Sequence, residues 1–173
     1  MTDPWPARLT VRPLTPDDAR RIGTWRYDGP WSVYDSRPEA EPVTAELGYW
    51  AVTGASGGPL VGYYCTGAEA RVPGLNAEPG VLDIGVGMAP HWVGQGHGPQ
   101  FGKAVLDHVR HHHGPTALRA AVQSWNTRSR KLTQQLGFHE QGRHTCTQNG
   151  QQIEYTILTT DEPPDRTTSR RRL

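Results

Sequence analysis

Short apolar runs of strand length recur along this chain, and segments in which apolar residues follow a helical period lie between several of them. The short runs predict strands at residues 9–13, 49–52, 60–64, 81–88, 117–123, 138–146 and 152–158. Helical periodicity predicts helices at residues 16–25, 99–113 and 126–136. Two predicted hairpins turn at Ser56-Gly57-Gly58 and at Asn149-Gly150. This order of elements predicts an α+β domain.

The segment that carries most functional information is VLDIGVGMAPHWVGQGHGPQFGKAVLDHV, at residues 81–109. Its pattern predicts a strand, a glycine turn at Gly94–Gly98, and a helix with Pro99 at its first position, where a missing N–H costs nothing. A glycine turn that opens a helix directs several backbone N–H groups outward at the positive end of the helix dipole. The segment therefore predicts an anion site, and phosphate is the usual ligand of such sites.

The glycine spacing excludes two common phosphate loops. A P-loop needs a glycine five residues before Gly102, where this chain has His97, and a hydroxyl residue two positions after Gly102, where it has Ala104. The dinucleotide fingerprint needs a third glycine at a position that Pro99 or Phe101 occupies here. The spacing is instead Gly-x-Gly-x-Gly, directly after a predicted strand.

A second informative segment, LRAAVQSWNTRSRKLTQQLGF, occupies residues 118–138. Its alternating strand ends before Asn126, and asparagine is a favoured N-cap residue at the start of a helix. Leu132 and Leu136 share one face of that helix, and Gly137 ends it. The order is therefore strand, asparagine, helix and Leu-Gly-Phe.

These two segments, in this order, resemble the GNAT superfamily of N-acetyltransferases over residues 8–159. The branch with ribosomal-protein N-terminal acetyltransferases is the most similar, on Asp83-Ile84-Gly85 before Pro90 and on Ser129 after Asn126. The resemblance implies a GNAT fold. Such a fold has a mixed, mostly antiparallel, twisted sheet of about six to seven strands and about four flanking helices. Its splayed central strands hold coenzyme A.

The resemblance also implies acetyl-CoA as the co-substrate, bound by residues of the first segment and by the asparagine of the second. The Met88 N–H would meet the thioester carbonyl, and Asn126 would contact the pantetheine arm or hold a water. The implied cofactor-binding residues are Met88, Ala89, Gly94, Gln95, Gly96, His97, Gly98 and Asn126. Val93 departs from the pattern, because the family usually has Gln or Arg three residues before Gly96. The change removes a side chain but no backbone donor, so we expect binding to survive.

Amine acetylation requires a neutral amine and a stabilised oxyanion, and the leaving thiolate benefits from an acid. Asp83 is the candidate base, directly or through water, or alternatively a structural aspartate. Many family members have a tyrosine seven residues after the asparagine, where this chain has Thr133. Ser129 would replace that acid, or alternatively is only a polar first-turn residue of the helix.

The acceptor amine is expected near an aromatic stretch that follows the first predicted helix, where the family places its acceptor loop. The candidate substrate-binding residues are Trp25, Tyr27, Trp31 and Tyr34. With Asp28 and Asp35 beside them, these rings would suit a cationic amine that has an apolar body. The alternative is a loop that its aromatic residues anchor to the core.

Charge, histidine spacing and cysteine content bear on the expected partners, metal binding and location of the protein. The formal net charge of +1 gives no reason to expect nucleic acid or membrane as a partner. The consecutive histidines His111–His113 cannot share a helix face, so no metal is expected. Cys65 and Cys146 form no Cys-x-x-Cys pair, and neither a signal peptide nor an apolar span of about 18 residues is visible. A cytoplasmic location is therefore expected, with one domain at residues 1–160 and a flexible polar tail at 161–173.

The function expected from these observations is acetyl transfer from acetyl-CoA to a primary amine, by direct attack in a ternary complex. The acceptor would be a protein N-terminus, a small amine or an amine-bearing antibiotic, and the enzyme a monomer or homodimer. The alternative is a non-catalytic acyl-CoA-binding regulatory module, because Val93 and Thr133 both depart from the family pattern.

Overall fold

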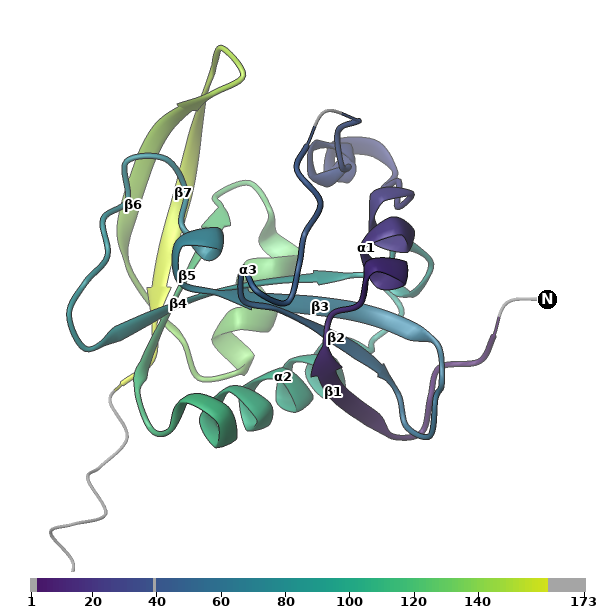
Figure 1. The fold of residues 1–173 in the computed structure, drawn as a ribbon. Helices are drawn as coiled ribbons and strands as arrows, with labels where there is room; N and C mark the ends of the chain where they lie inside the picture. Colours follow the sequence, from purple (N-terminus) through teal and green to yellow (C-terminus); the bar gives the residue numbers. More distant parts are fainter. Residues whose placement is uncertain (1–2, 39, 162–173) are drawn as a thin grey trace, which may run out of the picture.

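The computed structural model describes residues 3–38 and 40–161. Seven strands form one sheet in the order β1-β2-β3-β4-β5-β7-β6 (Figure 1). They are β1 Leu9–Pro13, β2 Tyr49–Gly54, β3 Leu60–Thr66, β4 Val81–Met88, β5 Ala117–Gln123, β6 His139–Gln148 and β7 Gln151–Thr159. Only the β4–β5 pair is parallel, so the expected mixed and mostly antiparallel sheet is confirmed.

The helices lie on both faces of this sheet. In the described part of the chain they are α1 Pro16–Gly23, α2 Gly98–His113 and α3 Thr127–Gln135, with 3₁₀ helices η1 Gly29–Tyr34, η2 Gly67–Ala70 and η3 Pro90–Trp92. In Figure 1, α2 lies along one face and α1 on the other. The predicted cap of α1 is confirmed, because Thr15 and Asp18 form a reciprocal capping box.

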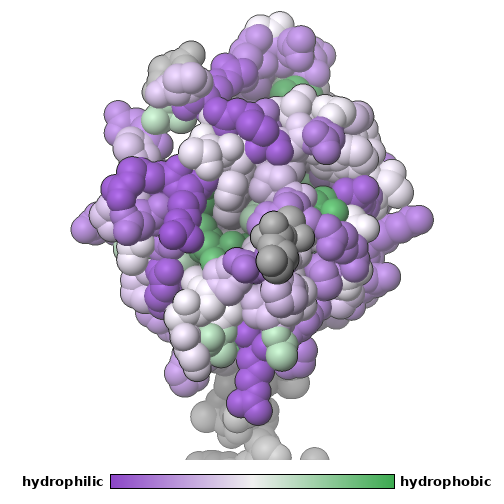
Figure 2. All heavy atoms as spheres, turned by 90° about the vertical axis from the view of Figure 1, so that its right-hand side faces the viewer, coloured by the Kyte–Doolittle hydropathy of each residue, from purple (hydrophilic) through white to green (hydrophobic). Residues whose placement is uncertain are grey.

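Each face of the sheet has its own apolar core. On the α2 face, Phe101, Val105 and Val109 of the helix are buried against the strands. The smaller core includes Leu14, Ile22 of α1 and strand residues such as Ala51 and Cys65. Figure 2 views the molecule from the right-hand side of Figure 1; hydrophilic residues dominate this face, and hydrophobic ones are visible in a hollow near its centre.

The two central strands separate along their length. Residues Val81–Asp83 of β4 pair with residues Ala117–Arg119 of β5, and the pairing of these two strands ends there. Beyond that point β4 continues beside β3 as far as Met88. β5 turns instead to β7, with which it pairs from Arg119 to Gln123. The expected splay of the central strands is therefore confirmed, and we call the opening between residues 84–88 and 120–123 the wedge.

Two expectations fall partly outside this description. The predicted tail begins at Asp161, which is exposed, and residues 162–173 lie outside the described part. No helix among the described residues is long and apolar enough to cross a membrane.

Candidate active site

The glycine turn lies between β4 and α2 with the backbone that an anion site requires. Gly94 and Gly96 have φ angles of +77° and +84°, in the left-handed region that favours glycine. α2 begins at Gly98, and no side chain of its N-cap His97 bonds to the first turn. The first N–H groups of this 16-residue helix therefore have no capping side chain at His97, and they carry the positive end of its dipole.

A guanidinium group lies beside this turn. A Cβ atom added to Gly94 would be 3.3 Å from a side-chain nitrogen of Arg128, which is in the first turn of α3. The same guanidinium lies 4.5 Å from the ring centroid of Trp31. Arg128 thus joins the turn to the aromatic stretch and brings a positive charge next to Val93, where the family usually has a polar side chain. The sequence analysis missed Arg128, although its place two residues after Asn126 was a usable signal.

The side chains of Gln95 and His97 have local partners. The Gln95 amide donates a hydrogen bond to the His91 carbonyl. The His97 ring stacks on Trp5, with centroids 4.1 Å apart and an interplanar angle of 2°. Trp5 is held in turn by a 2.8 Å hydrogen bond from its indole N–H to Gln100. Any part of Gln95 and His97 in anion binding would therefore come from their backbone N–H groups.

One wall of the wedge is the end of β4. The Ala89 N–H donates to the Val61 carbonyl at 2.8 Å, so it is already used within the sheet. Because backbone groups alternate along a strand, the Met88 N–H points to the opposite edge, toward the wedge. The Met88 carbonyl accepts a 2.7 Å hydrogen bond from the Tyr27 hydroxyl. Val86, two residues earlier, is 52% exposed, so this wall offers apolar surface.

The other wall, residues 120–123 of β5, continues to Asn126, which is 6% exposed and caps α3 as predicted. Its Oδ1 accepts from the Ser129 N–H at 3.1 Å, and its Nδ2 donates to the Tyr34 hydroxyl at 3.0 Å. The Ser129 carbonyl accepts from the Thr133 hydroxyl at 2.7 Å. Both of these contacts use the backbone of Ser129, and the role of its hydroxyl as the acid stays a prediction.

Aromatic residues form a connected group that is hydrogen-bonded to Met88 through Tyr27 and to Asn126 through Tyr34. Tyr34 stacks on Trp125 with centroids 6.2 Å apart, and it meets Tyr27 edge-to-face at 6.5 Å. Trp31 contacts Trp125 edge-on at 5.8 Å. Trp25 lies beyond the end of α1, against Tyr63. The sequence analysis missed Trp125, which is 41% exposed beside Asn126.

Asp83 has a different environment from the rest of the predicted site. It is 3% exposed, and both of its oxygens accept hydrogen bonds from Arg119, at 2.6 and 3.1 Å. Arg71 adds a third bond at 3.1 Å. Asp83 and Arg119 are register partners at the point where β4 and β5 part. These ion pairs fix the apex of the wedge, and they favour the structural alternative for Asp83 over the role of a base.

No group of three or more His, Cys, Asp or Glu side chains that could hold a metal ion occurs in residues 3–38 and 40–161. The site therefore consists of an N–H-lined turn with a neighbouring guanidinium, an apolar wedge, and an aromatic group above it. The first part fits a phosphate, and the second fits a narrow chain that carries a reactive group to Met88.

A family profile described as "Acetyltransferase (GNAT) domain" matches residues 8–139 of this chain. The match includes β1 to β5, the glycine turn and α3. No curated protein matches the chain by sequence.

Solved structures with the same arrangement include several acetyltransferases. A spermidine N-acetyltransferase chimera from Vibrio cholerae and hSSAT is 17% identical with a TM-score of 0.63, covering 89% of this chain and 95% of its own. A putative acetyltransferase from Salmonella typhimurium with its cofactor acetyl-CoA is 18% identical with a TM-score of 0.60, covering 92% and 99%. An aminoglycoside acetyltransferase in complex with coenzyme A is 19% identical with a TM-score of 0.59, covering 87% and 94%. At these identities the likeness is one of fold.

Proposed function

The chain belongs to the acetyltransferase (GNAT) domain family, and we propose that it moves an acetyl group from acetyl-CoA to a primary amine by direct attack in a ternary complex. The observation that carries the proposal is the alignment of three parts: the glycine turn at α2, the wedge between β4 and β5, and the Met88 edge. Together they suit a co-substrate with a phosphate at one end and a thioester at the other.

The residues of this chain fit acetyl-CoA. The N–H groups of the turn, Gly94–Gly98, would hold the pyrophosphate, with the Arg128 guanidinium beside them. The wedge would take the pantetheine arm, and Asn126 lies on its wall. The Met88 N–H would donate to the oxygen on which negative charge develops during acyl transfer. Acetyl-CoA supplies the acetyl group and a thiol that leaves readily.

We place the acceptor beside Tyr27, Trp31, Tyr34 and Trp125. Aromatic faces attract cationic amines, and Asp35 lies in the same segment, where its carboxylate accepts from the Tyr27 N–H at 2.8 Å. Among the related structures are enzymes named for spermidine and for aminoglycosides. A protein N-terminus is a third candidate, because Asp83-Ile84-Gly85 and Ser129 resemble the pattern of the ribosomal-protein N-terminal acetyltransferases.

The amine must lose a proton before or during its attack. Asp83 remains a candidate, but its three bonds to guanidinium groups would have to weaken for it to accept that proton. We propose instead that the proton leaves through water in the open acceptor side of the wedge, and that Asp83 positions β4 against β5.

The test is thiol release from acetyl-CoA in the presence of spermidine, an aminoglycoside or a short peptide with a free N-terminus, with coenzyme A binding followed by calorimetry. We expect turnover with one of these amines. A Gly96→Asp variant is the negative and Gly96→Asn is its control: both strain the same left-handed backbone in open space, and only the aspartate adds a charge that would repel phosphate. Gly98 is a poorer choice, since its Cβ would lie 3.0 Å from Leu132.

The outcomes separate the two functions left open by the sequence. If coenzyme A binds tightly but acetyl-CoA releases no thiol with any of the amines, a non-catalytic acyl-CoA-binding regulatory module is favoured. Undiminished binding in the Gly96→Asp variant would show that the phosphate lies elsewhere. The cytoplasmic location, and a monomeric or homodimeric state, stay predictions.

A further inference from the structure

We propose that the Tyr34 hydroxyl is the proton donor to the sulfur of coenzyme A. This inference rests on the proposed function. It places the acid of the reaction in the segment between α1 and β2, and not on α3, where many relatives have a tyrosine at the position of Thr133.

The direction of the Tyr34 hydroxyl is set by Asn126. The Oδ1 of Asn126 is used by the Ser129 N–H, so its Nδ2 must face Tyr34, and it donates to the phenol oxygen at 3.0 Å. An oxygen that accepts from Asn126 keeps its own proton available for another partner. Because Asn126 is buried as the N-cap of α3, the phenol is held by a fixed group.

The ring of Tyr34 is also held by its aromatic neighbours. It stacks on Trp125, and it makes an edge-to-face contact with Tyr27, with ring centroids 6.5 Å apart. The hydroxyl of Tyr27 donates a hydrogen bond to the Met88 carbonyl. Tyr27 therefore links the Tyr34 ring to the Met88 edge. Tyr34 remains 41% exposed, so a ligand can reach it.

The hydroxyl groups of α3 are less suitable for this role. Thr133 donates its proton to the Ser129 carbonyl at 2.7 Å, within its own helix. Ser129 contacts Asn126 through its backbone N–H and not through its hydroxyl, in the hydrogen bonds described. Tyr34 is the hydroxyl that the Asn126 side chain contacts directly.

The surroundings keep Tyr34 protonated. Burial raises the pKa of Tyr34 above its ordinary value, the hydrogen bond from Asn126 lowers it, and the neighbouring Tyr155 raises it further. The ionisable groups near it are Tyr155 on β7, Tyr27 in the same segment, and Arg128 of α3, which lies over the adjacent Trp31. The net direction is upward, so the phenol carries its proton at neutral pH.

The proposed step balances as follows. The amine nitrogen forms a bond to the acetyl carbon, and the carbon–sulfur bond breaks with its electron pair going to sulfur. Tyr34 gives its proton to that sulfur and accepts a proton from water afterwards, while the acetylated nitrogen loses one proton to water. The products are an amide and a free thiol, with no other reactant.

A binding experiment tests the proposal without an acceptor. Calorimetry compares coenzyme A with dethio-coenzyme A, in which hydrogen replaces the thiol, between about pH 6 and pH 9. If Tyr34 donates to sulfur, coenzyme A should gain affinity over the dethio compound as the thiol ionises, by about tenfold, as for a hydrogen bond to a charged group. The Tyr34→Phe variant should lose this gain, and the Tyr49→Phe variant, whose hydroxyl contacts Glu69, should keep it.

Each result decides the question. An equal gain in the Tyr34→Phe variant, or no gain in the parent, would overturn the role of Tyr34. Failure of either compound to bind the parent would overturn the proposed function with it. A second readout is the pH–rate profile: 3-fluorotyrosine at position 34, which has a more acidic phenol, should move the basic limb to lower pH. An unmoved limb would leave Tyr34 as a positioning residue only.

Discussion

At the scale of single residues, the partners of a side chain decide what chemistry it can do. The carboxylate of Asp83 is a group that could act as a base, but its contacts are those of a structural ion pair. Arg119 and Arg71 together donate three hydrogen bonds to it. Both oxygens of this carboxylate already accept hydrogen bonds from guanidinium groups, which leaves few lone pairs for the proton of an incoming amine. Asn126 shows the opposite case, since one amide both caps α3 and orients Tyr34.

Replacing Asp83 with asparagine should therefore cost stability more than catalysis. The variant removes the charge that faces Arg119 and Arg71, but Arg119 keeps its ion pair with Glu78, so we expect a loss of about 1.5–3 kcal/mol in the free energy of unfolding. Denaturant unfolding measures this. Asp107→Asn is the matched control, because its pair with Lys103 is exposed and should contribute less than about 1 kcal/mol. A stable Asp83→Asn variant with turnover reduced about 100-fold would restore Asp83 as the base.

Arg128 should matter for binding the co-substrate. Arg128→Gln keeps a polar side chain but removes the charge beside Gly94, so coenzyme A affinity should fall by about tenfold. The loss should shrink as salt rises, because exposed charges are screened. Arg143→Gln removes an equal charge from β6, where Arg143 pairs with Glu154, and should leave affinity unchanged. Equal, salt-independent losses in both variants would contradict the assignment.

At the scale of elements, close backbone approaches hold the site in register. Gly62 of β3 lies opposite Met88, under the ring of Phe101. A Cβ at Gly62 would lie 2.4 Å from that ring and 2.5 Å from the Gly87 carbonyl, and neither has room to move. The glycine thus lets α2 pack onto the sheet where β4 reaches the wedge.

Gly62→Ala should consequently destabilise the fold by about 1–3 kcal/mol, as overpacking of a close-packed interior does, and should weaken coenzyme A binding because Met88 shifts. Thermal unfolding and calorimetry measure the two effects. Gly142→Ala on β6 is the control: space around it is open, and we expect its stability to be unchanged or slightly higher. If both variants unfold at the parental temperature, the packing argument fails.

Three features of the fold could be predicted because their signals are local. The glycine turn, the N-cap Asn126 and the Asn149-Gly150 hairpin each depend on a few adjacent residues. The contacts that define the site are different. Tyr34 meets residues 125–126, and Asp83 meets Arg119 through strand register, so both depend on how distant segments pack. Nothing in the sequence near residue 34 or 83 encodes these partners.

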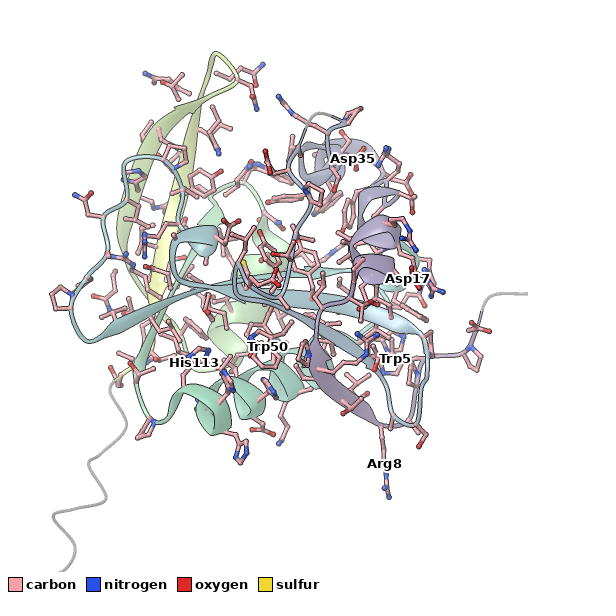
Figure 3. All side chains as sticks on the ribbon, viewed as in Figure 1. Trp5, Arg8, Asp17, Asp35, Trp50 and His113 are labelled. Atoms are coloured by element: carbon pink, nitrogen blue, oxygen red, sulfur yellow. The ribbon has the colours of Figure 1, made fainter. Side chains whose placement is uncertain are left out.

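At the scale of the whole molecule, separate segments converge on the two ends of the wedge. Trp5 of the N-terminal segment covers His97 at the glycine turn. On the acceptor side, Arg37 donates a 2.7 Å hydrogen bond to Asn149 at the tip of the β6–β7 hairpin. Figure 3 shows Asp35, which follows η1, on the other side of the sheet from His113 at the end of α2. The active site therefore depends on the integrity of both faces of the sheet.

The α2 face contains a group whose titration should affect that integrity. His108 contacts the Tyr64 hydroxyl at 2.7 Å and lies against Trp50, with centroids 4.6 Å apart. Burial lowers the pKa of His108, and the nearby His112, His111 and His113 lower it further. A histidine with a depressed pKa in the folded state binds fewer protons there than in the unfolded chain, so folding stability rises with pH across that interval.

We therefore expect the free energy of unfolding to fall as pH drops below about 6.5, the ordinary histidine pKa, through the lower folded-state pKa of His108. This loss of stability should occur at higher pH than the loss caused by protonation of Asp18, whose pKa is lowered from an ordinary value that is already near 4. Denaturant unfolding at intervals from about pH 8 to pH 5 measures the slope. His108→Gln should reduce it while retaining a polar partner for Tyr64, and the remaining slope would include His113, whose pKa burial also lowers. An unchanged slope in that variant would mean that the α2 face is indifferent to the charge of His108, and that other groups carry the pH dependence of the fold.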